Sequence, residues 1–207
     1  MRCVMVQTIV TAVIIYGATA LDLFVLLLIF FARAKTREQY RDIYIGQYLG
    51  SFVLIGISLF LAYVLNFVPE KWVLGLLGLI PIYFGLKVAI FGDSDEEIVE
   101  EQLEKRGLSK LVKTVSLVVI GSCGADNIGL FVPYFITLNS RELLITLIVF
   151  ILLIYLLVLT AQKLLNIGGI EEVVEKYSRW AMAIIYIGLG VFIIFENKTI
   201  QTIVSFF

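Results

Sequence analysis

The stretch VSLVVIGSCGADNIGLFVPYFITL, residues 115–138, is long and apolar enough to cross a membrane, yet it contains one carboxylate, Asp126. Roughly 20 apolar residues span the ~30 Å hydrocarbon core of a bilayer. A carboxylate inside that core is destabilising by several kcal/mol, so it normally faces a protein interior or a watery path. The stretch therefore predicts a transmembrane helix that holds a functional acid.

The composition of the whole chain agrees with this interpretation. Of its 207 residues, 60% are hydrophobic and 16% are charged, and the mean hydropathy is +1.00. These values exclude an ordinary soluble domain and predict an all-α integral membrane protein. The net charge of −1 arises mainly in short loops, and no basic patch points to a nucleic-acid partner. Besides residues 115–138, five further segments have the length and hydropathy of transmembrane helices: 4–31, 43–65, 72–91, 143–165 and 178–196.

The distribution of basic residues predicts the orientation of these six spans. Eleven lysines and arginines fall in the loops after the first, third and fifth spans, whereas four fall on the other side. Basic residues accumulate in cytoplasmic loops. We therefore expect a multi-pass protein of the cell membrane with both termini outside, whose first span is retained and is not a cleaved signal peptide.

Two matches within the chain indicate an internal repeat. Gly17 to Asp22 corresponds to Gly121 to Asp126 at a shift of 104 residues, and Ile82 to Gly85 corresponds to Ile185 to Gly188 at a shift of 103. Each repeat would hold three spans, and an odd number forces the second copy to enter the membrane from the opposite side. We predict two inverted three-helix repeats, residues 1–91 and 115–207, joined by an acidic cytoplasmic connector at 92–114.

The two aspartates are the predicted centre of a transport site. Cys123 lies three residues before Asp126, a spacing that puts both side chains on one face of a helix. A thiolate favours soft or borderline divalent cations, and carboxylates supply the compensating charge. We predict Asp22, Cys123 and Asp126 as metal ligands, with the two aspartates also carrying any proton coupling.

The residues around Asp126 favour a locally broken helix that lines a cavity, because glycines lower helix propensity and a proline frees a backbone carbonyl one turn back. The predicted substrate pathway comprises Thr19, Ser122, Gly124, Asn127 and Pro133. Other readings stay open: Cys123 as a small packed hydrophobe, and the aspartates as helix–helix hydrogen-bond partners. The other glycines of the spans, including Gly46, Gly50, Gly56, Gly78, Gly85, Gly188 and Gly190, are expected to let helices pack closely.

Missing residue types and motifs limit the function further. The chain has no histidine and no Walker A sequence, which argues against a His-rich metal site, His-based catalysis and direct use of ATP. We expect a secondary transporter, not an enzyme, with no permanently bound cofactor.

Three stretches resemble a known family: RDIYIGQYLG at 41–50, PEKWVLGLLGLIPIY at 69–83 and SCGADNIGLFVPY at 122–134. They are similar to the CadD cadmium-resistance transporters of Gram-positive bacteria, which belong to the LysE superfamily of small exporters. The resemblance covers essentially the whole chain. It implies a bacterial membrane protein that confers heavy-metal resistance by exporting Cd²⁺ from the cytoplasm, with Zn²⁺ as a further candidate substrate.

Two other functions remain alternatives at this point. An exporter of amino acids or small organic solutes would share the fold, but a zwitterion also needs a basic partner, and Lys87 is the one basic residue that lies more than two residues inside an apolar span. A membrane thiol-disulfide carrier would need a second cysteine in the other repeat. The position equivalent to Cys123 is Thr19, and Cys3 lies well away from it. The sequence is compatible with a monomer and with a homo-oligomer.

Overall fold

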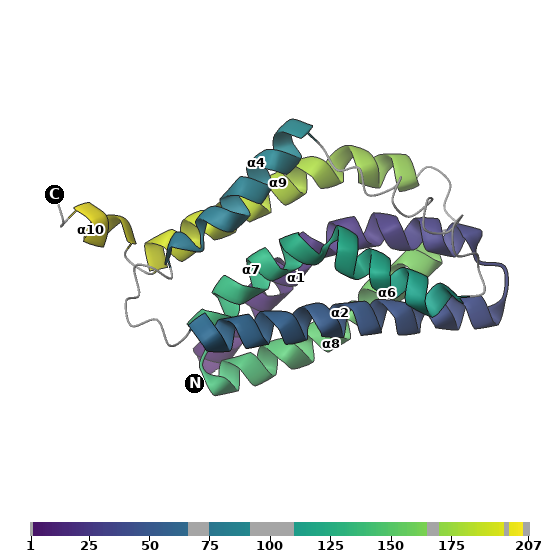
Figure 1. Ribbon diagram of the computed structural model, residues 1–207, viewed down its shortest axis with the longest axis horizontal. Helices are drawn as coiled ribbons and strands as arrows, with labels where there is room; N and C mark the ends of the chain where they lie inside the picture. The colour runs from purple at the N-terminus through teal and green to yellow at the C-terminus, as the bar shows by residue number, and fades with distance from the viewer. Residues whose placement is uncertain (1, 66–74, 92–109, 165–169, 197–198, 205–207) are drawn as a thin grey trace.

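The computed structural model describes residues 2–65, 75–91, 110–164, 170–196 and 199–204, and these segments are helical with no strand among them (Figure 1). Successive long helices run back and forth along one elongated bundle. The helices are α1 (Arg2–Arg33), α2 (Arg37–Leu65), α4 (Leu79–Phe91), α6 (Leu111–Ser122), α7 (Gly124–Thr137), α8 (Ser140–Leu164), α9 (Ile170–Glu196) and α10 (Thr199–Val204). The predicted all-α fold is confirmed.

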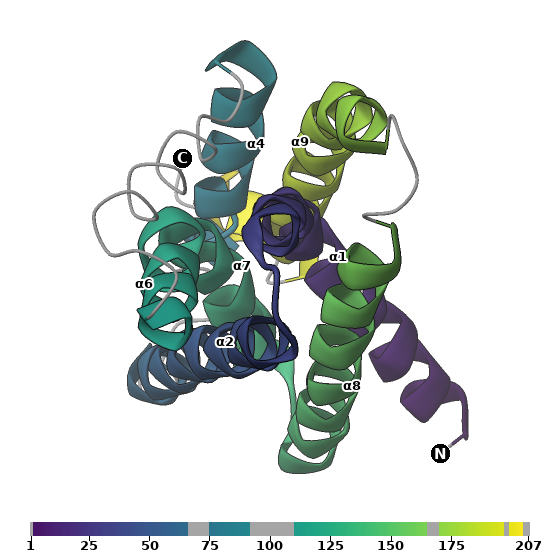
Figure 2. The ribbon, with the colours of Figure 1, turned by 90° about the vertical axis from the view of Figure 1, so that its right-hand side faces the viewer.

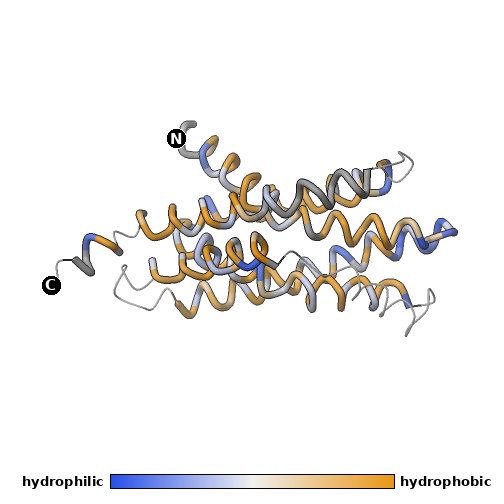
Figure 3. The backbone as a smooth tube through the Cα atoms, turned by 90° about the horizontal axis from the view of Figure 1, so that it is seen from above, coloured by the Kyte–Doolittle hydropathy of each residue, from blue (hydrophilic) through white to orange (hydrophobic). Residues whose placement is uncertain are grey.

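Within the described ranges, two to four segments have the length and hydropathy of a membrane span. α2 and α8 qualify as single helices, while α1 and the pair α6–α7 qualify if each is one bent span. Two shorter apolar helices, Leu79–Ile90 and Ala183–Phe195, complete the apolar part of the bundle. Hydrophobic residues dominate the middle of the bundle and hydrophilic residues mark one end (Figure 3). The structure thus supports a membrane protein, and the number of six spans stays a prediction.

The helix bounds differ from the predicted spans in several places, among them α4, which begins at Leu79 after a turn at residues 77–78. The segment 115–138 is two helices, because the chain breaks at Cys123. α9 begins at Ile170, before the predicted start at 178, and α10 was not predicted. Residues 92–109, which hold the acidic residues of the predicted connector, lie outside the described part of the chain, as do residues 72–74 of the third predicted span.

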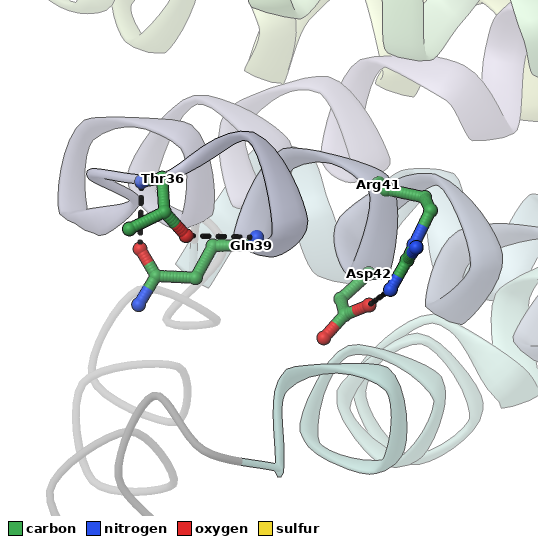
Figure 4. A network of polar contacts seen from close by, with 4 residues as sticks. All are labelled: Thr36, Gln39, Arg41 and Asp42. Carbon is green, nitrogen blue, oxygen red and sulfur yellow. Dashed lines mark hydrogen bonds and ion pairs between the residues drawn. The ribbon is translucent and has the colours of Figure 1, made fainter.

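A capping box fixes the start of α2 (Figure 4). The backbone N–H of Gln39 donates to Thr36 Oγ1 (3.2 Å), while Gln39 Oε1 accepts from the backbone N–H groups of Thr36 (3.1 Å) and Lys35 (2.7 Å). These bonds satisfy N–H groups that a helix start leaves without partners. The reversal between α1 and α2 is therefore short and well defined.

Helix pairs from distant parts of the chain make up the bundle. α4 packs along α9, α2 packs along α6 and α7, and α1 packs along α8 and α9. Viewed along its length, the bundle has α1 running through its middle (Figure 2). Hydroxyl groups join the helices at the end where α2 begins: Tyr44 OH donates to Gln162 Oε1 of α8 at 2.7 Å.

Glycines allow the closest of these contacts. A Cβ on Gly46 would lie 2.7 Å from Val115 Cβ, and one on Gly50 would lie 2.8 Å from Val119 Cβ. The backbone of α2 therefore packs directly against side chains of α6. Gly78, Gly85 and Gly190 serve the contact of α4 with α9 in the same way. The predicted packing role is wrong for Gly56 and Gly188, because a Cβ at either would meet no atom within 4 Å.

The buried apolar side chains form two clusters, one toward each end of the bundle. The Leu23 cluster joins the second half of α1 (residues 23–31) to α6, to Ile43 and Leu54 of α2, and to Val158 and Ala161 of α8. The Phe150 cluster joins the first half of α1 (residues 12–18) to residues 130–135 of α7, to Phe150 and Ile154 of α8, and to Tyr186 of α9. Along α1 the change from one cluster to the other falls between Ala18 and Leu23.

Candidate functional site

The predicted break in the fourth span is present, and it falls at Cys123. α6 ends at Ser122, α7 begins at Gly124, and the two helix axes differ in direction by 64°. Cys123 has φ −97° and ψ 3°, outside regular α geometry. Cys123 and Asp126 therefore do not share a face of one continuous helix: Cys123 is the junction, and Asp126 belongs to the first turn of α7.

The break is held in place by the side chain of Asn127. Its Nδ2 donates to the carbonyl oxygen of Cys123 at 2.7 Å, and its backbone N–H donates to the same oxygen at 3.0 Å. Asn127 and Cys123 are both buried, whereas Asp126 is half-buried. A carboxylate in the first turn of a helix is stabilised by the helix dipole. Asn127 therefore ties the first turn of α7, which carries Asp126, to the backbone of Cys123.

Of the other predicted pathway residues of this region, Ser122 and Gly124 flank the junction, and Pro133 lies further along α7. Ser122 is the last residue of α6, and its buried hydroxyl has no hydrogen-bond partner in the described structure. Gly124 opens α7 and faces α2, where a Cβ would lie 3.5 Å from Leu54 Cδ2. Pro133 lies buried inside α7. Ordinary helix ends leave the carbonyl groups of the last turn without intrahelical partners, so the junction offers oxygen atoms as well as a thiol.

The first span bends as well, between the parts of α1 on either side of Asp22. The segments Met5–Leu21 and Leu23–Arg33 of α1 differ in direction by 51°. The backbone of Asp22 is helical, and its side chain lies outside the described part of the structure. Thr19, one turn earlier, is fully buried, and its hydroxyl donates to the carbonyl oxygen of Tyr16 at 3.0 Å.

Both bends lie at the level where the two apolar clusters meet. On α1 the residues between the clusters are 19–22, and on the fourth span they are 124–129, since Cys123 belongs to the Leu23 cluster and Leu130 to the Phe150 cluster. Thr19 and Asn127 lie between the two clusters along their spans, and Ser122 lies directly before Cys123; we call these three residues the polar layer.

A family model described as cadmium resistance transporter matches residues 16–206. The chain belongs to this family. The match includes the second half of α1, the bent fourth span and the whole polar layer, and it confirms the family that the sequence resemblance implied. A transporter family also agrees with the expectation that the protein is not an enzyme. No curated protein and no solved structure matches the chain.

The described residues of this transporter do not complete a metal site by themselves. No group of three or more Cys, Asp or Glu side chains lies together in the part of the structure whose side chains are described. The predicted ligand set includes Asp22, whose side chain is outside that part. The set of Asp22, Cys123 and Asp126 therefore stays a prediction, which the two bends and the polar layer make testable.

Three buried polar side chains of α2 are missing from the predicted site. Gln47, Ser51 and Ser58 lie on the buried face of this helix, although it is otherwise apolar through its middle. Polar side chains at i, i+4 and i+11 share one helix face. That spacing within a membrane span was the available signal, because polar groups there are normally kept for a reason.

Beyond the polar layer, aromatic rings close the bundle. Phe150 of α8 packs against Tyr16 of α1 with ring centroids 5.3 Å apart, and against Phe131 of α7 at 4.9 Å. Further along lies a polar pocket of about 190 Å³, whose lining includes Thr8, Thr11, Thr137 and Glu142. The rings thus separate the polar layer from a pocket at the end where α1 begins.

Proposed function

We propose that this protein is a secondary transporter that exports Cd²⁺ from the cytoplasm and binds it in the polar layer between the two bent spans. The observation that carries the proposal is the coincidence of the two bends with the junction of the two apolar clusters. Membership of the cadmium resistance transporter family supports the substrate. Export of other soft divalent cations, Zn²⁺ among them, follows from the same chemistry.

Cys123, Asp126 and Asp22 are the proposed ligands. The thiolate of Cys123 supplies the soft donor that favours Cd²⁺, and the two carboxylates balance its charge. Carbonyl oxygens at the end of α6 are close to Cys123 along the chain and complete the coordination. Protonation of an aspartate would weaken the site, which gives a route for coupling export to protons.

The proposed architecture is two inverted repeats, and the helix packing supports it. Under exchange of the halves, α1 is replaced by α6–α7, α2 by α8 and α4 by α9. The contact of α1 with α8 then becomes that of α6–α7 with α2, and the contact of α4 with α9 is reproduced. The two apolar clusters exchange in the same way, since α1 residues 23–31 become residues 127–135.

The pattern of burial in α2 and α8 gives independent support for the repeat. The buried residues of α8 are Thr146, Phe150, Ile154, Val158 and Ala161. A shift of 103 residues maps them onto Ile43, Gln47, Ser51, Ile55 and Ser58, all of which are buried in α2. The shift equals that of the Gly85–Gly188 match in the sequence. Two helices with different side chains therefore present the same face to the bundle.

The orientation follows from the charges. Seven described basic residues lie at the end where α2 and α6 begin and α8 ends: Arg33, Lys35, Arg37, Arg41, Lys110, Lys113 and Lys163. We place this end in the cytoplasm. α10 and the start of α1 lie toward the opposite end, which puts both termini outside.

The alternative functions find less support. A zwitterionic solute would need a basic group near the site, but Lys87 is exposed on α4. A thiol-disulfide carrier would need a cysteine at Thr19, whose hydroxyl is instead bonded within α1. A soft-cation exporter uses the buried thiol and the aspartates together.

Cadmium tolerance of cells that carry single variants tests the proposal. We expect Asp126→Asn, Asp22→Asn and Cys123→Ser each to lower tolerance by about tenfold or more at equal expression, the scale of losing one partner of a charged group. Asp42→Asn is the matched control, because Asp42 lies at the start of α2, 3.6 Å from Arg41, away from the polar layer. Wild-type tolerance in all three site variants would refute the site.

A further inference from the structure

The buried polar side chains of α2 face the same interior as the proposed site. Gln47 and Ser51 lie between Ile43 and Leu54 on the buried face of the helix, and these two apolar residues belong to the Leu23 cluster together with Cys123. The contacts of Gly46 with Val115, Gly50 with Val119 and Leu54 with Gly124 fix the register of α2 against the fourth span. Gln47 therefore lies about 10 Å from the level of Leu54 and Gly124, toward the end of the bundle where α2 begins.

The aspartates lie at levels that this row spans. Phe31 of α1 packs against Tyr40 and Tyr44 of α2, with ring centroids 5.4 and 6.1 Å apart. When the rise per residue of an α-helix is counted from this contact along both helices, the backbone of Asp22 lies at about the depth of Ser51 in the bundle. On the other side of Leu54, Ser58 is one turn further along α2, as Asn127 is one turn beyond Cys123 in the fourth span. The row Gln47, Ser51 and Ser58 thus runs past the polar layer.

Two atoms of this row have no partner although they are fully buried. Gln47 is 0% exposed; its Nε2 donates to Ser51 Oγ at 3.2 Å, but its Oε1 accepts no hydrogen bond. Ser58 is also 0% exposed, and its hydroxyl has no partner. A buried polar atom without a partner is destabilising, so such atoms are rare unless a water or an ion visits them. Their positions on one helix face mark a path for a polar species.

At the three equivalent positions, α8 carries no polar side chain. Gln47, Ser51 and Ser58 correspond to Phe150, Ile154 and Ala161, all apolar and all fully buried. One half of the pseudo-symmetric bundle is thus lined by amide and hydroxyl groups, and the other is packed by an aromatic ring and aliphatic chains. This difference in side chains distinguishes the half of the bundle through which the ion would approach from the cytoplasm from the outer half, which is closed by packing.

We propose that the polar row of α2 is one wall of the cation path and that Gln47 Oε1 binds the cation on its approach from the cytoplasm. This inference rests on the proposed export of Cd²⁺ and names residues that feed its site. The amide oxygen of Gln47 replaces part of the hydration shell before the ion reaches Cys123 and the aspartates. Ser51 orients the amide by accepting from Nε2, so that the oxygen faces the path. The hydroxyl of Ser58 serves the ion on the far side of the layer.

Transport of Cd²⁺ into everted membrane vesicles tests this role, because the cytoplasmic face then meets the added ion. We expect Gln47→Leu to raise the KM for Cd²⁺ by about tenfold, as expected when a charged group loses one dipolar partner, and Gln47→Glu to restore a low KM. Ser58→Ala should lower transport with a smaller change in KM. Thermal stability of purified Gln47→Leu and Ser58→Ala should stay equal or rise, since each of these two changes removes a buried atom without a partner.

Ser116→Ala and Gln162→Leu are the matched controls. Ser116 Oγ donates to Gly46 O at 3.1 Å and Val112 O at 2.7 Å, and Gln162 accepts from Tyr44, so both are bonded and off the row. If Gln47→Leu does not fold, Gln47→Met and Ser58→Ala carry the test. The role of the row would be refuted if its variants kept the KM and rate of the controls in vesicles where Asp126→Asn abolishes transport. The proposed function would still stand in that case. If vesicles with the wild-type protein transported no Cd²⁺, both the role of the row and the proposed function would be refuted.

Discussion

Gly78 and Gly190 approach each other so closely that a side chain on either would strike the backbone of the other. A Cβ on Gly78 would lie 2.5 Å from the carbonyl oxygen of Gly190, and a Cβ on Gly190 would meet the carbonyl oxygen of Gly78 and Ile82. The contact joins α4 to α9, the third helix of each proposed repeat. Because backbone atoms are involved, no rotamer change can relieve the clash.

Gly190→Ala should therefore lower the free energy of unfolding by about 1–3 kcal/mol, the range for overpacking a tight contact. Gly188→Ala is the matched control two residues away. A Cβ there meets no atom within 4 Å, and the position lines an apolar groove between α1 and α9. Thermal melting in detergent measures both. Equal melting temperatures for the two variants would contradict the close approach.

Phe150 should control access to Cys123 from outside. Phe150 is packed against Tyr16, Phe131 and Phe135 between the polar layer and the polar pocket at the end where α1 begins. In a Cys3→Ser background, we expect an external, membrane-impermeant methanethiosulfonate to label Cys123 slowly, and Phe150→Ala to speed the labelling at least about tenfold, since the truncation leaves a cavity. Phe60→Ala, at an exposed position of α2, is the control and should change nothing. Fast labelling of the parent protein would show that the rings do not close the path.

Cys123 should set the preference for soft cations. Replacing its sulfur by oxygen in Cys123→Ser keeps the size of the group but removes the soft donor. We expect Cd²⁺ transport in everted vesicles to become sensitive to competition by Mn²⁺, an ion that favours oxygen ligands, with the Cd²⁺ to Mn²⁺ preference falling about tenfold or more. An unchanged preference would mean that Cys123 is a packing residue only. Ser122→Ala, the adjacent change, should leave the preference intact.

The start of α2 should depend on Thr36. Its side chain accepts from the backbone N–H of Gln39, and its loss as Thr36→Ala should destabilise the protein by about 1 kcal/mol. Thr160→Ala is the control, because the hydroxyl of Thr160 bonds only within α8, to the carbonyl oxygen of Leu156. Transport of Cd²⁺ should be unaffected by either change, and a transport defect without a stability defect would disprove the capping role.

The sequence was a good guide to the helices and to the break in the fourth span. Hydropathy located α1, α2 and α8 because membrane-length apolar runs have few alternatives to a helix. The glycines around Cys123 and the following Pro133 predicted a broken helix, and α6 does end beside Cys123. The spacing of Cys123 and Asp126 was less informative, since it assumes a continuous helix that the break removes.

Other features depend on packing that no short pattern encodes. Gly56 and Gly46 look alike in sequence, but Gly46 meets α6 while Gly56 faces open space, because only the rotation of α2 decides which glycine is covered. Gln47 and Phe150 share a position in the proposed repeat, yet their chemistry hides the relation until burial is known. The aromatic closure around Phe150 combines three distant segments of the chain, which hydropathy treats separately.

The break at Cys123 divides the fourth span into parts with different attachments. Gly46 and Gly50 clamp α6 to α2, whereas α7 rests on α1, α2, α4 and α9. Any swing of α7 about the junction would carry Asp126 with it and leave Cys123 with α6. A stationary thiol and a movable carboxylate would then share the bound ion, and their separation would loosen its hold without rebuilding the rest of the bundle.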